Sequence, residues 1–182
     1  MHQLNEAELY KALEFAKSVD ETTGRLMIQK FQTNLPVFYE MSFNLFPGPI
    51  STKNRDMAYY YLDLCFDVLA VFEFIFGKVP DQETLAPDWL DKQSQMINSR
   101  LKPALERKKI EKKTYESLRK SFLHKFEDET HVNQSGLIDF INDQIDQFVA
   151  EESSRASATH VTKIMILIFI FSLGNIYSQS RI

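Results

Sequence analysis

The sequence predicts an all-α protein, a single compact bundle of about six or seven helices that spans residues 1–182. Apolar residues recur three and four positions apart along most of the chain, which is the spacing of one helix face. No stretch alternates apolar and polar residues as a half-buried strand does. The chain has only 5 glycines and 6 prolines, about half the average share of these turn-forming residues. A hydrophobic content of 44% supplies one sizeable core and excludes a disordered chain.

The first helix is predicted to begin at Asn5. Asn5 can cap the helix while the side chain of Glu8 reaches back to the capping residue. Leu4 can then pack against Leu9 across the helix start. The pattern leaves open whether this helix continues without interruption or breaks between residues 19 and 24. Its apolar positions are Leu9, Leu13, Ala16, Met27 and Phe31.

A proline opens the second helix, because the first helical position needs no backbone N–H. This residue is Pro36, and one face of the helix carries Phe38, Met41 and Leu45. The Pro-Gly-Pro sequence at 47–49 is expected to end the helix.

The third helix is predicted from about residue 53 to residue 76. Ser51 or Thr52 can cap its start, and Gly77 is a suitable residue for its C-terminal end. From residue 57 to residue 76 the helix is apolar on nearly every side. We therefore expect this helix to lie at the centre of the fold.

Helical patterns also cover the second half of the chain. Pro87 opens a segment that Pro103 bends or ends, and residues 115–126 form the next helical stretch. Two more helices are predicted, one from about residue 135 to residue 152 and the last from about residue 155 to residue 177. The first of these two carries a single apolar stripe: Leu137, Ile138, Ile141, Ile145, Phe148 and Val149.

The two halves of the chain carry similar apolar patterns. At an offset of 100 residues, apolar positions agree in order and spacing over successive helices. The agreement indicates a pseudo-repeat with halves at 5–79 and 113–180 and a connector at 80–112. The two most apolar helices, 53–76 and 155–177, are then expected to pack against each other. The paired positions include Val37 with Leu137 and Leu45 with Ile145.

Cysteine usage and the first residues favour a cytoplasmic protein. The start has no basic region followed by an apolar stretch, so we expect no secretory signal. The single cysteine, Cys65, lies among apolar residues and is predicted to be a small buried hydrophobe. The apolar segment 164–177 would span about 21 Å as a helix, against about 30 Å for a bilayer core. We predict that it is a buried core helix and that the protein has no membrane association.

Charge is distributed unevenly along the chain. Residues 100–125 hold ten Lys and Arg against three Glu, whereas residues 127–152 hold eight Asp and Glu and no Lys or Arg. The basic segment 100–125 can bind RNA or an acidic partner. Alternatively, it lies beside the acidic helix of the same bundle and the two neutralise each other.

Arg119 and His124 carry the one catalytic hypothesis with specific residues. A histidine can act as general acid or base on a ribose 2′-hydroxyl, and an arginine can stabilise phosphate charge in the transition state. The spacing Arg119-x4-His124 resembles the Arg-x4-6-His motif of HEPN domains, which are helical bundles that cleave RNA without a metal. The chain departs from the family at Lys120, where the family favours Asn, Asp or His. The alternative is a surface arginine and a helix-face histidine, since the pseudo-repeat, at an offset of 95 residues in this part of the chain, places Gln29 at the position of His124.

A metal site is the second hypothesis. His124, Asp128 and His131 are spaced i, i+4 and i+7, which places them on one face if the helix continues that far. A fourth ligand is needed, and His160 is a candidate. The sequence has no His-Glu-x-x-His motif, so we interpret these residues as solvated groups at a helix end and predict no bound metal.

Acidic residues on the most apolar helix are the third hypothesis. Asp63 and Asp67 lie four residues apart, with Glu73 further along. Paired carboxylates on a helix can hold Mg²⁺, but such sites are normally richer in aspartate. We therefore interpret these residues as the exposed edge of the helix or as groups paired with neighbours, for example Asp63 with Lys163.

The sequence lacks the motifs of several enzyme classes. It has no Gly-rich phosphate loop, no Gly-x-Ser-x-Gly elbow, no Cys-x-x-Cys pair and no dinucleotide fingerprint. By elimination, we predict a non-enzymatic protein without cofactor that binds another protein or a second copy of itself. The alternative is a HEPN-like ribonuclease that uses Arg119 and His124, with RNA bound along residues 100–125.

Overall fold

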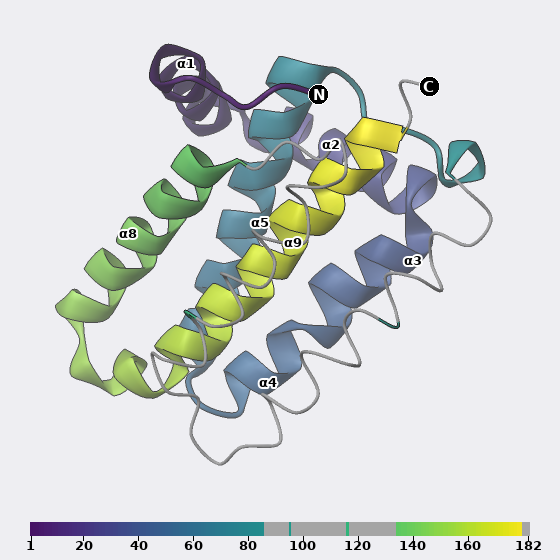
Figure 1. Ribbon diagram of the computed structural model, residues 1–182. Coiled ribbons are helices and arrows are strands. Elements are labelled where there is room, and N and C mark those ends of the chain that lie inside the picture. Colours follow the sequence, from purple (N-terminus) through teal and green to yellow (C-terminus); the bar gives the residue numbers. More distant parts are fainter. Residues whose placement is uncertain (86–94, 96–115, 117–133, 180–182) are drawn as a thin grey trace.

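A computed structural model describes residues 1–85, 95, 116 and 134–179 (Figure 1). These residues form helices and contain no strand, which confirms the predicted all-α bundle. The α-helices are α1 (Glu6–Ser18), α2 (Glu21–Asn34), α3 (Pro36–Tyr39), α4 (Pro47–Ser51), α5 (Arg55–Phe76), α8 (Ser135–Glu151) and α9 (Thr159–Gln179). A π-helical segment, Glu40–Leu45, joins α3 to α4, and 3-10 segments cover Gln82–Thr84 and Ser153–Ala158.

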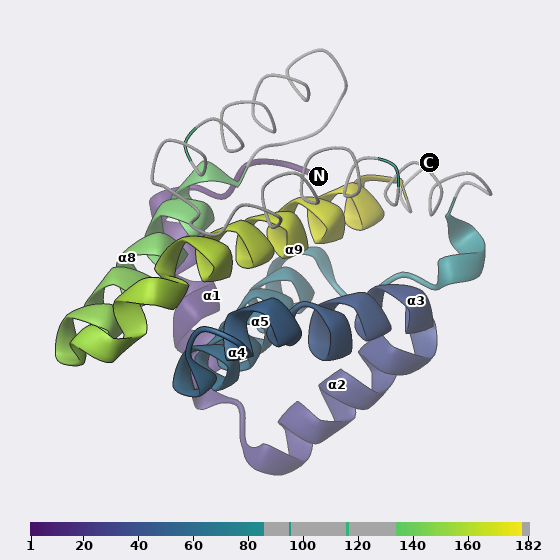
Figure 2. The same cartoon turned by 90° about the horizontal axis from the view of Figure 1, so that it is seen from below.

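The helix α9 lies in the middle of the bundle. It packs against α4, α5 and α8, and Figures 1 and 2 show α8 on one side of it and α3 with α4 on the other. The helix α5 also packs against α1, α2 and α4. One continuous hydrophobic core joins these helices, from Leu4 near the N-terminus to Tyr177 in α9.

Local capping signals place the ends of the first helices. The Asn5 side chain accepts a hydrogen bond from the Glu8 backbone N–H at 3.0 Å, and the Glu8 carboxylate accepts one from the Asn5 N–H at 3.0 Å. The predicted capping box is therefore confirmed. The chain then breaks at Val19, and Asp20 caps α2 by accepting a hydrogen bond from the Thr23 N–H at 2.9 Å.

The predicted boundaries between residues 45 and 55 are confirmed only in part. The π-helical segment ends at Leu45, just before the Pro-Gly-Pro sequence, but Pro47 also starts α4, because a proline at the first helical position removes only an N–H that has no partner within the helix. The cap of α5 is Asn54, whose side chain accepts from the Met57 N–H at 2.9 Å, in place of Ser51 or Thr52. The predicted end of α5 at Gly77 is confirmed, since Gly77 adopts φ 90°, a conformation that favours glycine.

The helix expected at the centre, α5, packs against α1, α2, α4 and α9, but α9 is the more completely buried of the two apolar helices. Every residue from Val161 to Tyr177 of α9 is buried, whereas α5 has a buried side and a solvent-facing side with Tyr59, Asp63 and Phe74. As expected, α5 and α9 pack against each other. The pseudo-repeat stays a prediction.

The positions that the pseudo-repeat pairs differ in exposure. Val37 and Leu45 are exposed, whereas their matched residues Leu137 and Ile145 are buried. The sequence agreement between the halves therefore does not extend to the exposure of these two pairs.

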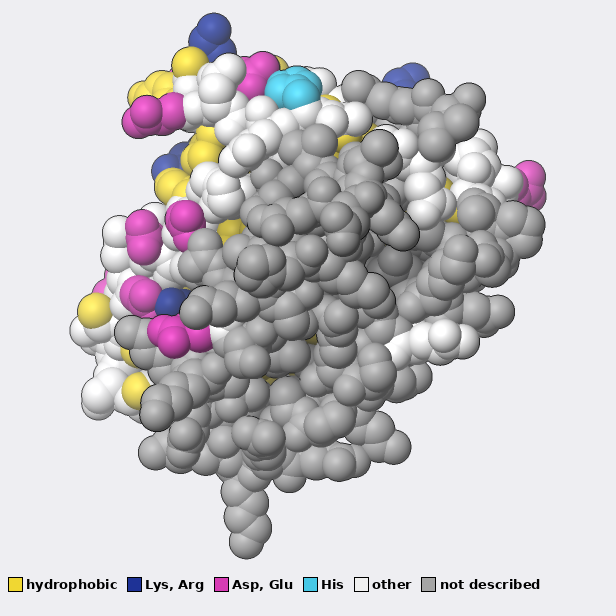
Figure 3. Space-filling view, in the orientation of Figure 1, with side chains coloured by type: hydrophobic (Ala, Val, Ile, Leu, Met, Phe, Trp, Pro, Cys, Tyr) yellow, Lys and Arg dark blue, Asp and Glu magenta, His cyan; other side chains and the backbone are white. Residues whose placement is uncertain are grey.

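The helix α8 begins at Ser135, as predicted, and is amphipathic. Its apolar stripe, including Ile138 and Ile141, is buried. Asp139, Asp143 and other carboxylates of α8 face solvent, and Figure 3 shows acidic side chains over this helix at the left of the molecule.

By length and composition, the helical stretch Ser153–Gln179 is the one candidate for a membrane span within the described residues. However, 72% of its most apolar window is buried inside the bundle. This helix includes α9, so its apolar character is accounted for by its place in the core.

An aromatic cluster joins α9 to α2, α3 and the π-helical segment. The ring of Phe169 stacks on Phe38 at 5.3 Å and meets Phe31 and Phe43 edge-on at 6.1 and 6.3 Å. Such aromatic pairs stabilise the fold by more than the burial of their apolar area alone. The cluster therefore fixes the π-helical segment, which carries Phe43, against the core.

A candidate binding groove between α2 and α5

An open groove with a volume of about 550 Å³ runs along α2. Its walls come from α2, from the π-helical segment and from the middle of α5. The apolar part of the lining consists of Val19, Ile28, Phe43, Leu62 and Phe66, and the polar part consists of Asp20, Glu21, Arg25, Gln29, Gln32 and Asp63, with Gly24 between them.

One face of α2 forms the longest wall. Asp20, Gly24, Ile28 and Gln32 line the groove at intervals of four residues, so they lie on one helix face. The break at Val19 separates α2 from α1. Without this break, residues 21–34 would extend α1 along its own axis, and they would not form the wall of the groove.

A glycine allows α2 to approach α5 closely. A Cβ atom at Gly24 would lie 3.3 Å from Cζ of the Phe66 ring, which is tighter than ordinary van der Waals contact. The aromatic ring of Phe66 therefore packs directly under α2 and closes the floor of the groove.

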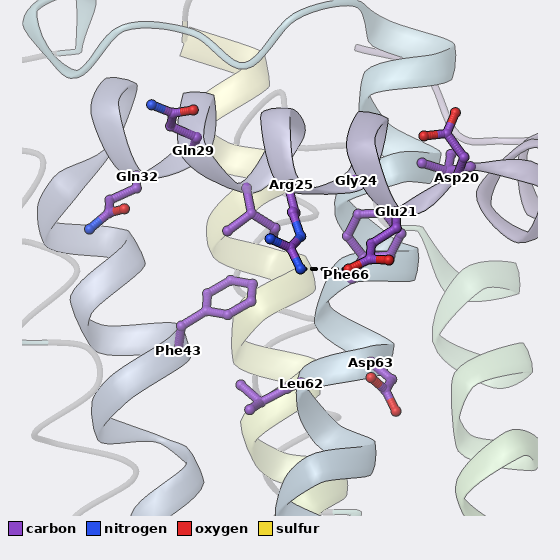
Figure 4. A pocket seen from close by; sticks show the side chains of 12 residues that line it. Asp20, Glu21, Gly24, Arg25, Gln29, Gln32, Phe43, Leu62, Asp63 and Phe66 are labelled. Carbon is purple, nitrogen blue, oxygen red and sulfur yellow. Dashed lines mark hydrogen bonds and ion pairs between the residues drawn. The ribbon is translucent and has the colours of Figure 1, made fainter.

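The π-helical segment places Phe43 on the opposite wall. The Phe43 ring stacks on Tyr39 at 5.1 Å and contacts Phe31 at 5.8 Å, so its orientation is fixed from two sides. The buried hydroxyl of Tyr61 donates a hydrogen bond to the Ser42 carbonyl at 3.1 Å and anchors the segment to α5. Figure 4 shows Phe43 and Leu62 pointing toward each other across the groove.

The groove has an acidic end and a neutral end. Asp20, Glu21 and Asp63 lie toward one end in Figure 4, and Gln29 and Gln32 lie toward the other, beside Phe43. The acidic end is also the end at which α2 begins.

The charged groups of the groove differ in what they contact. Both carboxylate oxygens of Asp20 accept hydrogen bonds from Thr23, which lowers the pKa of Asp20. Glu21 is paired with Arg25. Asp63 makes no hydrogen bond or ion pair with another described residue, and partial burial raises the pKa of its carboxyl group.

A second acidic group lies one helical turn from the groove. Asp67 is half-buried on α5. Burial is the main factor that raises its pKa to about 6, and the negative charge of Asp63 acts in the same direction, against the positive charge of Lys17 on α1. Asp67 does not line the groove.

Most of the sequence-predicted site residues lie outside the described part of the chain. This applies to Arg119, His124, Asp128, His131 and the basic segment 100–125. The ribonuclease and metal hypotheses at these residues stay predictions. His160 is half-buried near the start of α9. Within residues 1–85 and 134–179, no group of three or more His, Cys, Asp or Glu side chains is placed to hold a metal.

The predicted ion pair between Asp63 and Lys163 is wrong. The Lys163 ammonium lies 2.6 Å from Oδ1 of Asp146 on α8. Although α5 and α9 are neighbours, Lys163 is on the side of α9 that faces α8. Asp63, by contrast, lines the groove with α2.

Comparisons with known proteins add no family. No family model matches the chain, no curated protein is similar to it, and no solved structure matches its fold. The resemblance to HEPN domains therefore rests only on the spacing of Arg119 and His124.

Sequence reasoning missed the groove. Its walls come from residues far apart in the chain, such as Ile28, Phe43 and Leu62. One local signal was present, since a glycine inside a helical pattern, here Gly24, often has a packing reason.

Proposed function

We propose that this protein is a non-enzymatic binding protein and that its groove holds an apolar helical segment of a partner protein. The observation that carries the proposal is the open groove itself, with its apolar floor of Ile28, Phe43, Leu62 and Phe66. Its volume of about 550 Å³ is that of a pocket for a small ligand, so the groove takes the side chains from one face of a helix while the rest of that helix stays outside.

The walls favour a helix as the bound element. They are built from helices, whose backbone N–H and C=O groups bond within the helix. An extended peptide would find no free strand edge along these walls and would leave its own backbone groups unpaired. A helix satisfies its own backbone and needs only an apolar face for the groove.

The length of the α2 wall sets the size of the partner segment. From Asp20 to Gln32 the wall extends over about 18 Å at the rise of a helix. A bound helix of about three turns covers this length, and apolar side chains at positions i, i+3, i+4 and i+7 face the floor.

A synthetic helix tests the proposal with a matched pair of variants. The probe is a fluorescein-labelled 14-residue peptide, stapled to hold it helical, with leucines along one face, and binding is measured by fluorescence anisotropy. We expect Leu62→Ser to weaken binding about tenfold or more, because it removes a leucine contact from the floor. Leu26→Ser is the control, since Leu26 is 51% exposed on α2 and does not line the groove.

Comparison with the Leu26→Ser control shows which results would contradict the proposal. Equal affinities for the wild type and both variants would show that the peptide binds elsewhere. A wild type that does not bind the peptide at all would contradict the proposal directly. Circular dichroism melting checks that both variants remain folded.

A further inference from the structure

We propose that the partner helix carries a lysine or arginine in its last turn, and that it binds antiparallel to α2 with this cation facing Asp63. This inference rests on the proposed function. It adds the charge and the direction of the segment that the groove accepts.

Among the described residues that line the groove, four are charged, and three of these already make structural interactions. Asp20 caps α2 through Thr23. Glu21 lies in the first turn of α2, where a negative charge is favourable, and it pairs with Arg25. Asp63 is the remaining one.

Asp63 is available to pair with a cation of the partner. Its carboxylate has no hydrogen-bond or ion-pair partner among the described residues, and the apolar side chains of Leu62 and Phe66 lie beside it in the lining. A carboxylate that loses part of its hydration without gaining a partner is destabilised in its charged form. A lysine or arginine of the partner would supply the missing charge-assisted hydrogen bond.

The other end of the groove does not compete for this cation. Gln29 and Gln32 line it with neutral amides, and the ring of Phe43 lies beside them. The carboxylates of the lining lie at the opposite end, where Arg25 pairs with Glu21 and leaves Asp63 without a cation, so a positive charge of the partner is favoured at that end. The same carboxylates repel phosphate groups, so this groove does not suit nucleic acid.

The direction of the bound helix follows from the direction of α2. The acidic end of the groove is the N-terminal end of α2, which carries the positive end of the helix dipole. An antiparallel partner places the negative end of its own dipole there. Lysine and arginine are favourable in the last turn of a helix. In the antiparallel orientation the last turn of the partner helix lies at the acidic end of the groove, so a cation in that turn faces Asp63.

The test uses peptides that differ only in one terminal turn. Four 14-residue stapled helices share the same leucine face: one has Lys in the last turn, one Gln, one Glu, and the fourth has Lys moved to the first turn. Anisotropy titrations at 50 mM NaCl are expected to show the last-turn Lys peptide binding about five- to tenfold more tightly than the Gln peptide. The Glu peptide and the first-turn Lys peptide are expected to bind more weakly than the last-turn Lys peptide.

Two variants of the protein separate this inference from the proposed function. Asp63→Asn is expected to bring the affinities of the Lys and Gln peptides to within twofold, while Leu62→Ser weakens all four peptides. Asp56→Asn, an exposed aspartate in the first turn of α5 outside the groove, is expected to keep the preference for Lys.

The contradictory outcomes are also distinct. Equal binding of the Lys, Gln and Glu peptides to the wild type, with the effect of Leu62→Ser retained, overturns the inference and leaves the proposed function standing. A preference for Lys that survives Asp63→Asn overturns the assignment to Asp63. Absence of binding for all four peptides overturns both proposals.

Discussion

The helices α5 and α9 are both long and rich in apolar residues, yet they have different roles. From Val161 to Tyr177, α9 is buried without interruption, and its aromatic side chains hold the bundle together. The helix α5 is buried on one side and open on the other, where Asp63 and Phe66 meet the groove. Apolar content alone therefore does not distinguish a fully buried helix from a helix that borders an open groove.

Carboxylates mark the difference between the two helices. Asp63, Asp67 and Glu73 lie on α5, and burial raises the pKa of each. Between Val161 and Tyr177, the charged residue is Lys163, which pairs with Asp146. A helix that keeps three carboxylates among apolar residues retains contact with water along one side.

The largest expected effect contrasts one phenylalanine from each helix. Phe169→Ala removes the centre of the aromatic cluster in α9, where the side chain is fully buried, and is expected to lower the free energy of unfolding by about 3–5 kcal/mol. Phe74→Ala on α5 removes a ring that is 46% exposed, and we expect a loss below about 1 kcal/mol. Urea unfolding of both variants measures the difference.

Similar losses for the two phenylalanine variants would contradict the expected difference between α9 and α5. They would show that the open side of α5 is as tightly packed as the core around α9. The stacked contact of Phe74 with Phe15 at 4.9 Å is the interaction that such a result would implicate.

An intermediate effect concerns the pH dependence of the free energy of unfolding that Asp67 on α5 causes. Its pKa is raised from 3.8 to about 6 in the folded protein, so the folded state binds its proton more tightly than the unfolded state. Stability from this group is fully present below about pH 4, falls as pH rises, and is lost above about pH 6. The groups around it are Asp63, whose charge raises the pKa further, and Lys17, whose charge lowers it.

Asp67→Asn removes this dependence. At pH 7 the variant is expected to be more stable than the wild type by about 1 kcal/mol, a value reduced for solvent screening at a partly exposed site. At pH 4 the two proteins are expected to unfold at the same urea concentration. A variant that is less stable than the wild type at pH 7 would contradict the burial of a charged Asp67.

Local signals explain which parts of the fold were predictable. The capping box of Asn5 and Glu8 and the glycine at 77 depend only on neighbouring residues, and their predictions were confirmed. The start of α4 at Pro47 was missed because a proline can either end a helix or begin one. Sequence alone did not show that α9 is buried from Val161 to Tyr177 while α5 keeps one side open to solvent.

The candidate site depends on contacts between distant segments of the chain, which the sequence pattern of a single segment does not predict. Phe43 reaches the groove because a π-helical segment changes the register after α3, and the pattern at 36–45 indicated an ordinary helix. Gly24 and Phe66 meet only after α2 has folded onto α5. Of the two acidic residues at 63 and 67, Asp63 lies on the exposed edge of its helix, across the groove from α2, whereas Asp67 is half-buried and does not line the groove.

The smallest expected effect concerns the ion pair that Lys163 of α9 makes with Asp146 of α8. Lys163 is buried along its stem, yet its ammonium reaches Asp146, whose side chain is 59% exposed. Long cationic side chains often bury their stems and keep their charge near water. A double-mutant cycle with Lys163→Met and Asp146→Ala is therefore expected to give a coupling energy of only about 0.2–1 kcal/mol, which 1 M NaCl weakens. A coupling above about 2 kcal/mol that is insensitive to salt would place the charge inside the core, and α9 would then carry a buried ion pair where α5 carries open carboxylates.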